Sequence, residues 1–144
     1  MKRNLVISPE GHLMLGGVDA VALAKEYHTP LYVMEEDVVR SAMRAYRRSM
    51  EEFYQGHGLV CYASKAFCCK EMCRIAMAEG LGLDVVSGGE LYTALSVGFP
   101  SEKIVFHGNN KSEAELSMAL DQGVGRIVVD GLEELSLICR LAAE

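Results

Sequence analysis

A single lysine follows the most strand-like apolar run in the chain. The run extends from Leu59 to Tyr62, and Lys65 comes shortly after it. Because ligands collect beyond the carboxyl ends of parallel strands in α/β folds, a lysine at this position points to a ligand-binding mouth. A lysine amine whose pKa is lowered attacks carbonyl carbons, and Schiff-base formation with pyridoxal phosphate is one such reaction. The alternative is a solvated lysine at a strand end.

Asp84 and His107 accompany two later apolar runs, much as Lys65 follows the first. If these runs are parallel strands, their carboxyl ends bring the three residues and the segment Asn109-Asn110-Lys111 to one mouth. A carboxylate at Asp84 can hold a protonated imine on the lysine. The alternative is a half-buried strand carboxylate that pairs with any nearby donor. We assign no specific role to His107 or to the three residues of the loop.

The segment Ser87-Gly88-Gly89 resembles the start of an anion-binding helix, where glycines allow close approach and unpaired N–H groups point outward. Ser87 is also a natural cap for the helix that follows. We expect the capping role.

Four apolar runs recur at nearly even steps in the second part of the chain. They begin near Leu59, Leu81, Ile104 and Arg126, which gives steps of 22, 23 and 22 residues. Each step holds a strand, a loop and a helix, and such alternation predicts a parallel sheet. Between the runs lie predicted caps and helix-ending glycines, namely Ser87, Ser112 and Asp130, then Gly80, Gly98 and Gly123. Periodicity alone fits both an eight-stranded barrel and a doubly wound sheet.

The first part of the chain follows other patterns. Residues 5–15 alternate around Pro9-Glu10-Gly11 and predict a β-hairpin, and Asp19 is placed to cap a short helix over residues 20–27. From Glu36 the period becomes helical, and Gly56 ends the pattern. The apolar stripe of this helix is expected to face the core and consists of Val39, Met43, Tyr46, Met50 and Phe53.

Composition restricts the class of protein. The chain has 144 residues, 50% of them hydrophobic and 24% charged, as is usual for one globular domain. Its formal charge of -6 disfavours nucleic acid and anionic membrane as partners. Neither a signal peptide nor a long apolar span is present, so we expect a cytoplasmic protein.

The five cysteines are odd in number and contain no Cys-x-x-Cys pair, so disulfides are not expected. Cys69 and Cys73 could share a helix face near His57 and bind a soft metal. The preferred interpretation is that the cysteines are reduced, small apolar residues and that the chain holds no metal.

Three longer segments resemble diaminopimelate decarboxylases, which are group IV pyridoxal-phosphate-dependent decarboxylases with the alanine-racemase fold. These segments are YASKAF at 62–67, GLDVVSGGELYTAL at 82–95 and FHGNNKS at 106–112. Related decarboxylases for ornithine or arginine usually differ at the third segment. The resemblance extends over essentially the whole chain, but the chain covers only the first part of the family.

The resemblance implies an α/β fold, the first half of a (βα)₈ TIM-type barrel preceded by a short β-hairpin segment. Residues 1–35 are expected to pack with a C-terminal β-domain, and residues 36–144 to form the first part of the pyridoxal-phosphate-binding barrel. The sequence ends within a predicted helix, and we therefore expect it to be truncated.

The implied activity of the complete protein is decarboxylation of meso-diaminopimelate to L-lysine. The resemblance makes Lys65 the Schiff-base lysine for pyridoxal 5'-phosphate and gives Asp84 a supporting, cofactor-binding role. It also implies a homodimer, since the family's proton-donating cysteine comes across a subunit interface from a later segment. We expect this chain alone to be inactive. Two alternatives are a decarboxylase of another basic amino acid, ornithine or arginine, and a non-catalytic pyridoxal-phosphate-binding module.

Overall fold

The computed structural model describes residues 5–143. The chain divides into two compact units, residues 1–45 and residues 46–144. The division falls within helix α2 (Glu36–Tyr54). The division that the family resemblance implies stays a prediction: a segment of residues 1–35 that packs with a C-terminal β-domain, and a barrel part formed by residues 36–144.

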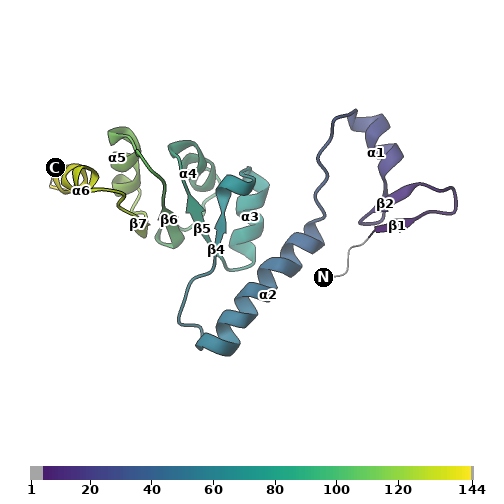
Figure 1. Cartoon of the computed structure of the whole chain (residues 1–144), viewed down its shortest axis with the longest axis horizontal. Coiled ribbons are helices and arrows are strands. Elements are labelled where there is room, and N and C mark those ends of the chain that lie inside the picture. The colour runs from purple at the N-terminus through teal and green to yellow at the C-terminus, as the bar shows by residue number, and fades with distance from the viewer. Residues whose placement is uncertain (1–4, 144) are drawn as a thin grey trace. The chain divides into compact units, whose positions relative to one another are not determined.

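Four parallel strands form the sheet of the second unit: β4 (Cys61–Ala63), β5 (Gly82–Val85), β6 (Ile104–Phe106) and β7 (Arg126–Ile127). They lie in the order of the chain, and the register pairs Ala63 with Asp84 and Asp84 with Val105 (Figure 1). The parallel sheet that the even spacing predicts is confirmed.

A helix follows each strand of this sheet. These helices are α3 (Lys70–Ala78), α4 (Gly88–Leu95), α5 (Glu113–Asp121) and α6 (Leu132–Leu141), with short 3₁₀ turns η1 (Ser64–Ala66) and η2 (Ser101–Lys103). Crossovers between parallel strands are right-handed, so strands in sequential order place their helices on one face of the sheet. This arrangement belongs to a barrel wall, whereas a doubly wound sheet has helices on both faces.

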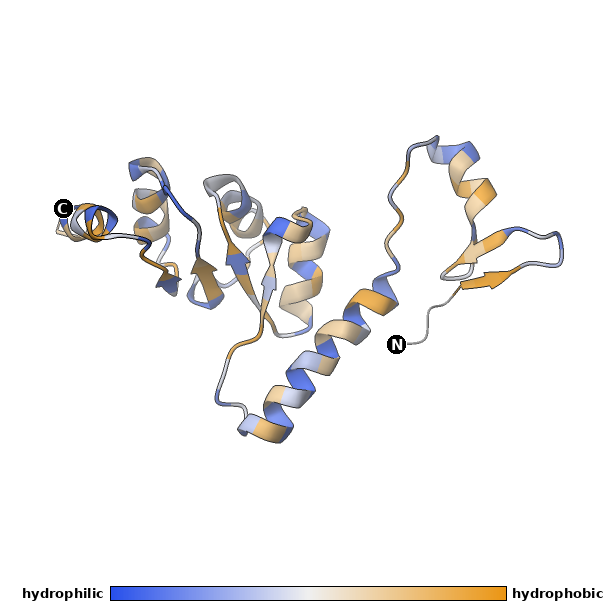
Figure 2. Ribbon diagram, viewed as in Figure 1, coloured by the Kyte–Doolittle hydropathy of each residue, from blue (hydrophilic) through white to orange (hydrophobic). Residues whose placement is uncertain are grey.

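Burial agrees with helices on one face only. Leu83 and Val85 of β5 and Ile104 and Phe106 of β6 are fully buried, whereas Asp84 between them is half-buried. Because successive strand residues point to opposite faces, the buried set faces the helices and Asp84 faces the other way. Figure 2 shows the apolar character of these strands and the mixed faces of the helices around them.

Side-chain caps begin two of the helices as predicted. The Ser87 hydroxyl accepts a hydrogen bond from the Glu90 amide at 3.2 Å and caps α4. Ser112 and Glu115 form a reciprocal capping box at α5. Asp130 was predicted to cap the last helix and does not, because α6 starts one residue later, with Gly131 as its cap residue. The Asp130 amide instead donates to the Glu134 carboxylate at 3.3 Å.

Helix α2 has the predicted length and charge pattern, but its apolar stripe is only partly buried. Met43 is buried, whereas Tyr46 is 69% exposed and Phe53 is 72% exposed. A helix buries its stripe only against a second apolar surface, and the described residues supply none over these two rings. Among residues 5–143, no helix is long and apolar enough to cross a membrane.

The first unit is built on an antiparallel sheet of β1 (Leu5–Ile7), β2 (Leu13–Leu15) and β3 (Val18–Asp19), followed by α1 (Ala20–Tyr27). The predicted hairpin is confirmed, with Leu5 paired to Leu15 and a left-handed Gly11 in the turn. Its strands leave apolar side chains exposed, among them Val6 at 60% and Ile7 at 66%.

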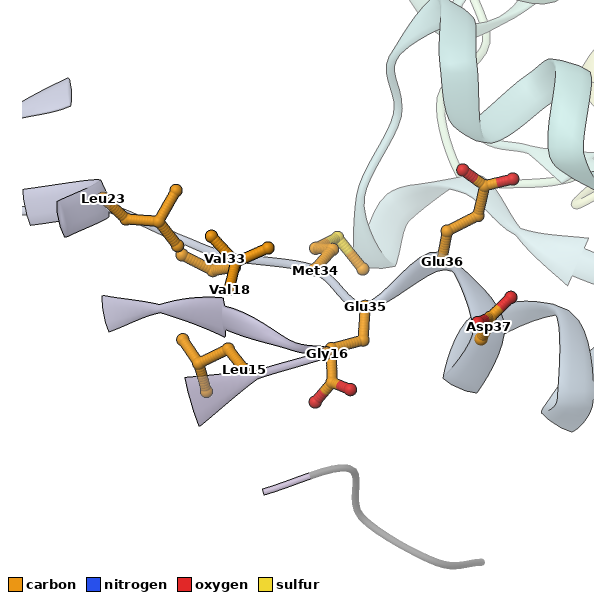
Figure 3. Close-up of a pocket in the computed structure, with 9 residues that line it drawn as sticks. All are labelled: Leu15, Gly16, Val18, Leu23, Val33, Met34, Glu35, Glu36 and Asp37. Carbon is orange, nitrogen blue, oxygen red and sulfur yellow. The ribbon is translucent and has the colours of Figure 1, made fainter. Parts of the chain in front are cut away.

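A cavity of about 440 Å³ lies between this sheet and the extended segment that precedes α2 (Figure 3). Apolar side chains from β2, β3, α1 and the extended segment line one part, and carboxylates at the start of α2 line the other. The lining residues are Leu15, Gly16, Val18, Leu23, Val33, Met34, Glu35, Glu36 and Asp37. One Glu35 carboxylate oxygen is buried there without a hydrogen-bond partner among the described residues.

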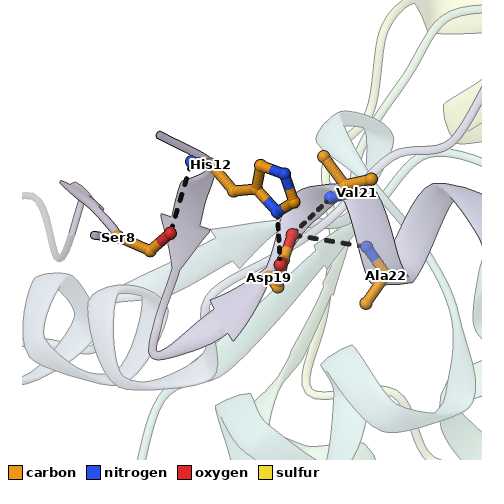
Figure 4. A network of polar contacts seen from close by, with 5 residues as sticks. All are labelled: Ser8, His12, Asp19, Val21 and Ala22. Atoms are coloured by element: carbon orange, nitrogen blue, oxygen red, sulfur yellow. Dashed lines mark hydrogen bonds and ion pairs between the residues drawn. The ribbon is translucent and has the colours of Figure 1, made fainter. Parts of the chain in front are cut away.

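Asp19 joins the hairpin to α1 (Figure 4). One carboxylate oxygen accepts hydrogen bonds from the Val21 amide at 2.7 Å and the Ala22 amide at 3.3 Å, and the other lies 2.8 Å from the His12 Nδ1. The contact with His12, together with the amide bonds, lowers the pKa of Asp19. The predicted cap is therefore confirmed, and its carboxylate is also held by His12, the residue before β2.

Gly82 lies where a side chain would meet backbone. A Cβ at this position would lie 2.5 Å from the Lys103 carbonyl oxygen and 2.9 Å from the Cys61 Sγ. We therefore expect Gly82→Ala to lower the free energy of unfolding by about 1–3 kcal/mol through overpacking. Urea denaturation measures the change.

Gly89→Ala is the matched control, since a Cβ there would have only the Ser87 hydroxyl near it, at 3.9 Å. It should leave stability unchanged or slightly raised. Equal losses from both substitutions would contradict the close approach at Gly82.

Candidate functional site

The carboxyl ends of β4, β5 and β6 lie at one edge of the sheet and bring together the residues that the sequence singles out. Lys65 lies in η1, two residues after Ala63, and Ala63 pairs with Asp84 in the neighbouring strand. Its side chain is exposed. An exposed amine at this edge is accessible to a ligand.

Asp84 and His107 face each other across β5 and β6. The His107 Nδ1 lies 3.9 Å from the Asp84 Oδ1, and the two side chains are 51% and 28% exposed. The His107 amide donates to the Val85 carbonyl at 2.8 Å, which fixes the start of the loop after β6. At 3.9 Å the contact is electrostatic and too long for a hydrogen bond.

Two buried polar atoms beside Lys65 have no hydrogen-bond partner among residues 5–143. They are the Ser64 hydroxyl and the Asp84 Oδ1. Ser64 is only 1% exposed. Because buried polar atoms almost always have partners, two orphans at one edge indicate a place where a polar ligand completes the network. No pattern in the sequence marks Ser64, since its burial depends on the packing of η1 against β5.

The start of α4 is already occupied by a side chain. The Gly88 amide, at the first position of the helix, donates to the Glu115 Oε1 at 2.7 Å. The other Glu115 oxygen accepts from the Ser112 amide at 2.9 Å. A carboxylate thus fills the position that an anion would take, and the expected capping role of Ser87 is confirmed.

Lys111 does not present a free amine at the mouth. Its side chain is 1% exposed, and the ammonium lies 2.9 Å from the Glu134 Oε1. It also donates to the carbonyls of Gly108 at 2.6 Å and Val128 at 2.8 Å. The neighbouring residues Asn109 and Asn110 are exposed and border a cavity of about 470 Å³ that extends to α6.

Cys61, Cys68 and Cys73 are poor nucleophiles. Burial raises the pKa of Cys73 to about 12, and burial also raises the pKa values of Cys68 and Cys61. A protonated thiol does not attack carbonyl carbons or bind metal readily. Within residues 5–143, no group of three or more His, Cys, Asp or Glu side chains is arranged to hold a metal ion.

Comparison with known proteins relates the chain to one cofactor. Residues 36–144 match the family described as pyridoxal-dependent decarboxylase, pyridoxal binding domain. The chain is 51% identical over 141 residues to a diaminopimelate decarboxylase from Bacillus methanolicus, which corresponds to 96% of this chain and 32% of the relative. The chain therefore spans about a third of the length of such relatives.

Solved structures show the same similarity. A diaminopimelate decarboxylase from M. jannaschii in complex with L-lysine is 38% identical, with a TM-score of 0.83, and covers 96% of this chain and 32% of its own. A lysine/ornithine decarboxylase from Vibrio vulnificus in complex with putrescine is 26% identical, with a TM-score of 0.74, over 92% of this chain and 34% of its own.

Glu115 connects two loops at this edge, and its titration tests that connection. Hydrogen bonds from the Gly88 and Ser112 amides lower the pKa of Glu115 below its usual value. The stabilisation is therefore complete above the usual carboxyl pKa and is lost as the pH falls through the lowered one. We expect Glu115→Gln to cost about 1 kcal/mol at neutral pH and progressively less in acid.

Denaturation of both proteins across an acid-to-neutral series measures the difference. Glu113→Gln, on the exposed first residue of α5, is the matched control and should change little. A Glu115→Gln deficit that stays constant down to the lowest pH would rule out a role for the charged carboxylate.

Proposed function

The chain belongs to the family of pyridoxal-dependent decarboxylases, and from this premise we propose that it is the first part of a diaminopimelate decarboxylase. Its fold is the first half of the family's (βα)₈ barrel, preceded by a β-hairpin, and the family's cofactor is pyridoxal 5'-phosphate, both as the sequence predicts. The complete protein then converts meso-diaminopimelate to L-lysine and carbon dioxide.

One observation carries most weight for the site. Lys65 presents an exposed amine at the end of β4, directly after a buried serine hydroxyl and beside a strand in which the Asp84 Oδ1 also has no hydrogen-bond partner among the described residues. These residues fit a polar, carbonyl-bearing cofactor held covalently at the lysine and by hydrogen bonds beside it.

The proposed roles follow from charge and position. Lys65 holds the cofactor through its ε-nitrogen, and Asp84 stabilises positive charge that develops near that nitrogen. When bound, pyridoxal phosphate accepts the electron pair released as carbon dioxide leaves the substrate. His107 lies on the same side of the mouth, with its Nδ1 3.9 Å from the Asp84 Oδ1.

The rest of the site is proposed to lie outside this chain, which spans about a third of its relatives. Residues 1–35 then pack with a later β-domain, while residues 36–144 supply the first strands of the barrel. We further propose a cytoplasmic homodimer, since a second subunit can contribute a proton donor to the mouth. The formal charge of -6 makes nucleic acid an improbable partner.

The competing function is decarboxylation of ornithine or arginine, and a third possibility is a non-catalytic pyridoxal-phosphate-binding module. Identity favours the first function, because the similarity to a diaminopimelate decarboxylase reaches 51%, against 26% for the lysine/ornithine enzyme. The segments 82–95 and 106–112, which line the mouth, carry the resemblance to that branch. Lys65 does not discriminate, since a lysine anchor is common to these chemistries.

Substrate competition tests the function. The complete protein should prefer meso-diaminopimelate to ornithine, arginine and lysine by about 10⁴-fold in kcat/KM, because a site that pairs a distal ammonium and carboxylate leaves buried polar groups unpaired when the substrate lacks the distal carboxylate. Carbon dioxide release from each amino acid measures this ratio.

Comparable efficiency with ornithine or arginine would assign the chain to the second function. Binding of the cofactor without turnover of any of the four amino acids would assign it to the third.

A further inference from the structure

Lys111 is the most completely bonded charged side chain at the carboxyl edge of the sheet. Its ammonium has three donors, and three oxygens receive them: the Gly108 carbonyl at 2.6 Å, the Val128 carbonyl at 2.8 Å and the Glu134 Oε1 at 2.9 Å. The side chain is 1% exposed and that of Glu134 is 10% exposed. A lysine in this state is not available to react with a ligand.

The three oxygens belong to three different parts of the edge. Gly108 is the residue after His107 in the loop that follows β6, Val128 follows β7, and Glu134 lies in the first turns of α6. At this edge a backbone hydrogen bond joins the residue after β7 to β6: the Val128 amide donates to the Phe106 carbonyl at 2.8 Å. The Lys111 ammonium adds a side-chain hydrogen bond to the Gly108 carbonyl.

Gly108 also touches the loop after β5. It has a φ of 108°, and a Cβ there would lie 3.3 Å from the Val86 carbonyl oxygen. The His107 amide beside it bonds to the Val85 carbonyl. A displacement of Gly108 therefore changes the position of the neighbouring His107 ring relative to Asp84.

We propose that Lys111 is a positioning residue whose buried ammonium holds the loop after β6 against β7 and α6 and so keeps His107 at Asp84 on the cofactor side of the sheet. The catalytic consequence of this role rests on the proposed function, whereas the contact between Lys111 and the loop does not.

The chemistry of the ammonium explains why a lysine is required. It is a compact point charge with three rotatable donors, which suits three converging oxygens, whereas a planar guanidinium presents its donors in a fixed fork. Removing the charge leaves two carbonyls without this donor and a nearly buried carboxylate without its cation. Glu115 lies close enough for Lys111 to favour its charged form as well.

Lys111 bonds both to a carboxylate and to two backbone carbonyls. Its effect on the position of the loop can therefore be separated from its effect on the stability of the fold. Glu134→Gln removes the buried charge of the partner but leaves both bonds from Lys111 to the carbonyls of Gly108 and Val128. It should lower stability while the loop stays in place. Lys111→Met removes all three bonds and should release the loop.

Amide hydrogen exchange of the 144-residue chain measures the loop without any cofactor. In Lys111→Met, exchange at the His107 and Val128 amides should accelerate by about tenfold or more relative to the β5 amides, which lie outside the contact. Glu134→Gln should leave that ratio near the wild-type value. Lys103→Met, which removes an exposed lysine before β6, is the matched control and should change neither amide.

If Lys111→Met does not fold, the double variant Lys111→Met/Glu134→Gln leaves no unpaired charge buried there and should show the same local acceleration. Unchanged exchange at His107, or a uniform increase over the whole sheet, would overturn the positioning role.

The complete protein with pyridoxal phosphate bound gives the catalytic readout. Lys111→Met should lower kcat/KM for decarboxylation by about tenfold or more, since small misplacements near a reacting centre are costly, and Glu134→Gln should lower it much less. Accelerated exchange with undiminished kcat/KM would make Lys111 structural only. Absence of turnover in the wild-type protein would instead refute the proposed function and leave the exchange result standing.

Discussion

The parallel register of β4, β5 and β6 is the constraint on which the site depends. Because the strands run in one direction and in chain order, every loop that follows a strand emerges at the same edge. Right-handed crossovers keep the helices on one face, so the opposite face keeps Asp84 half-buried. Lys65, Asp84 and His107, which are about twenty positions apart in sequence, thus lie at the same edge of the sheet.

Charged side chains then fix the loops that this register brings together. Glu115 connects the loop before α5 to the first amide of α4, and Lys111 connects the loop after β6 to β7 and α6. Both are fully hydrogen-bonded, as buried or partly buried charges must be. At the edge that carries Lys65, the Ser64 hydroxyl and the Asp84 Oδ1 have no hydrogen-bond partner among residues 5–143, which supports the proposed ligand site there.

The sequence predicted what local chemistry decides. Period, caps and glycines located the strands and most helix ends, and the run before Lys65 placed the lysine at a strand end. It missed what distant packing decides: the 27-residue link from Glu115 to Gly88 and the burial of Lys111 have no local signature. Asp130 fitted the cap pattern, but the helix began one residue later, a shift that residue spacing does not resolve.

The identity of the anchoring lysine tests the central claim most directly. The complete protein, incubated with pyridoxal phosphate and reduced with borohydride, is digested and its pyridoxyl-bearing peptides are identified by mass spectrometry. The adduct is expected on Lys65, whereas Lys111 should stay unmodified because its ammonium is buried and fully bonded. Recovery of the adduct on Lys70, Lys103 or Lys111, with Lys65 unmodified, would contradict the assignment of the site.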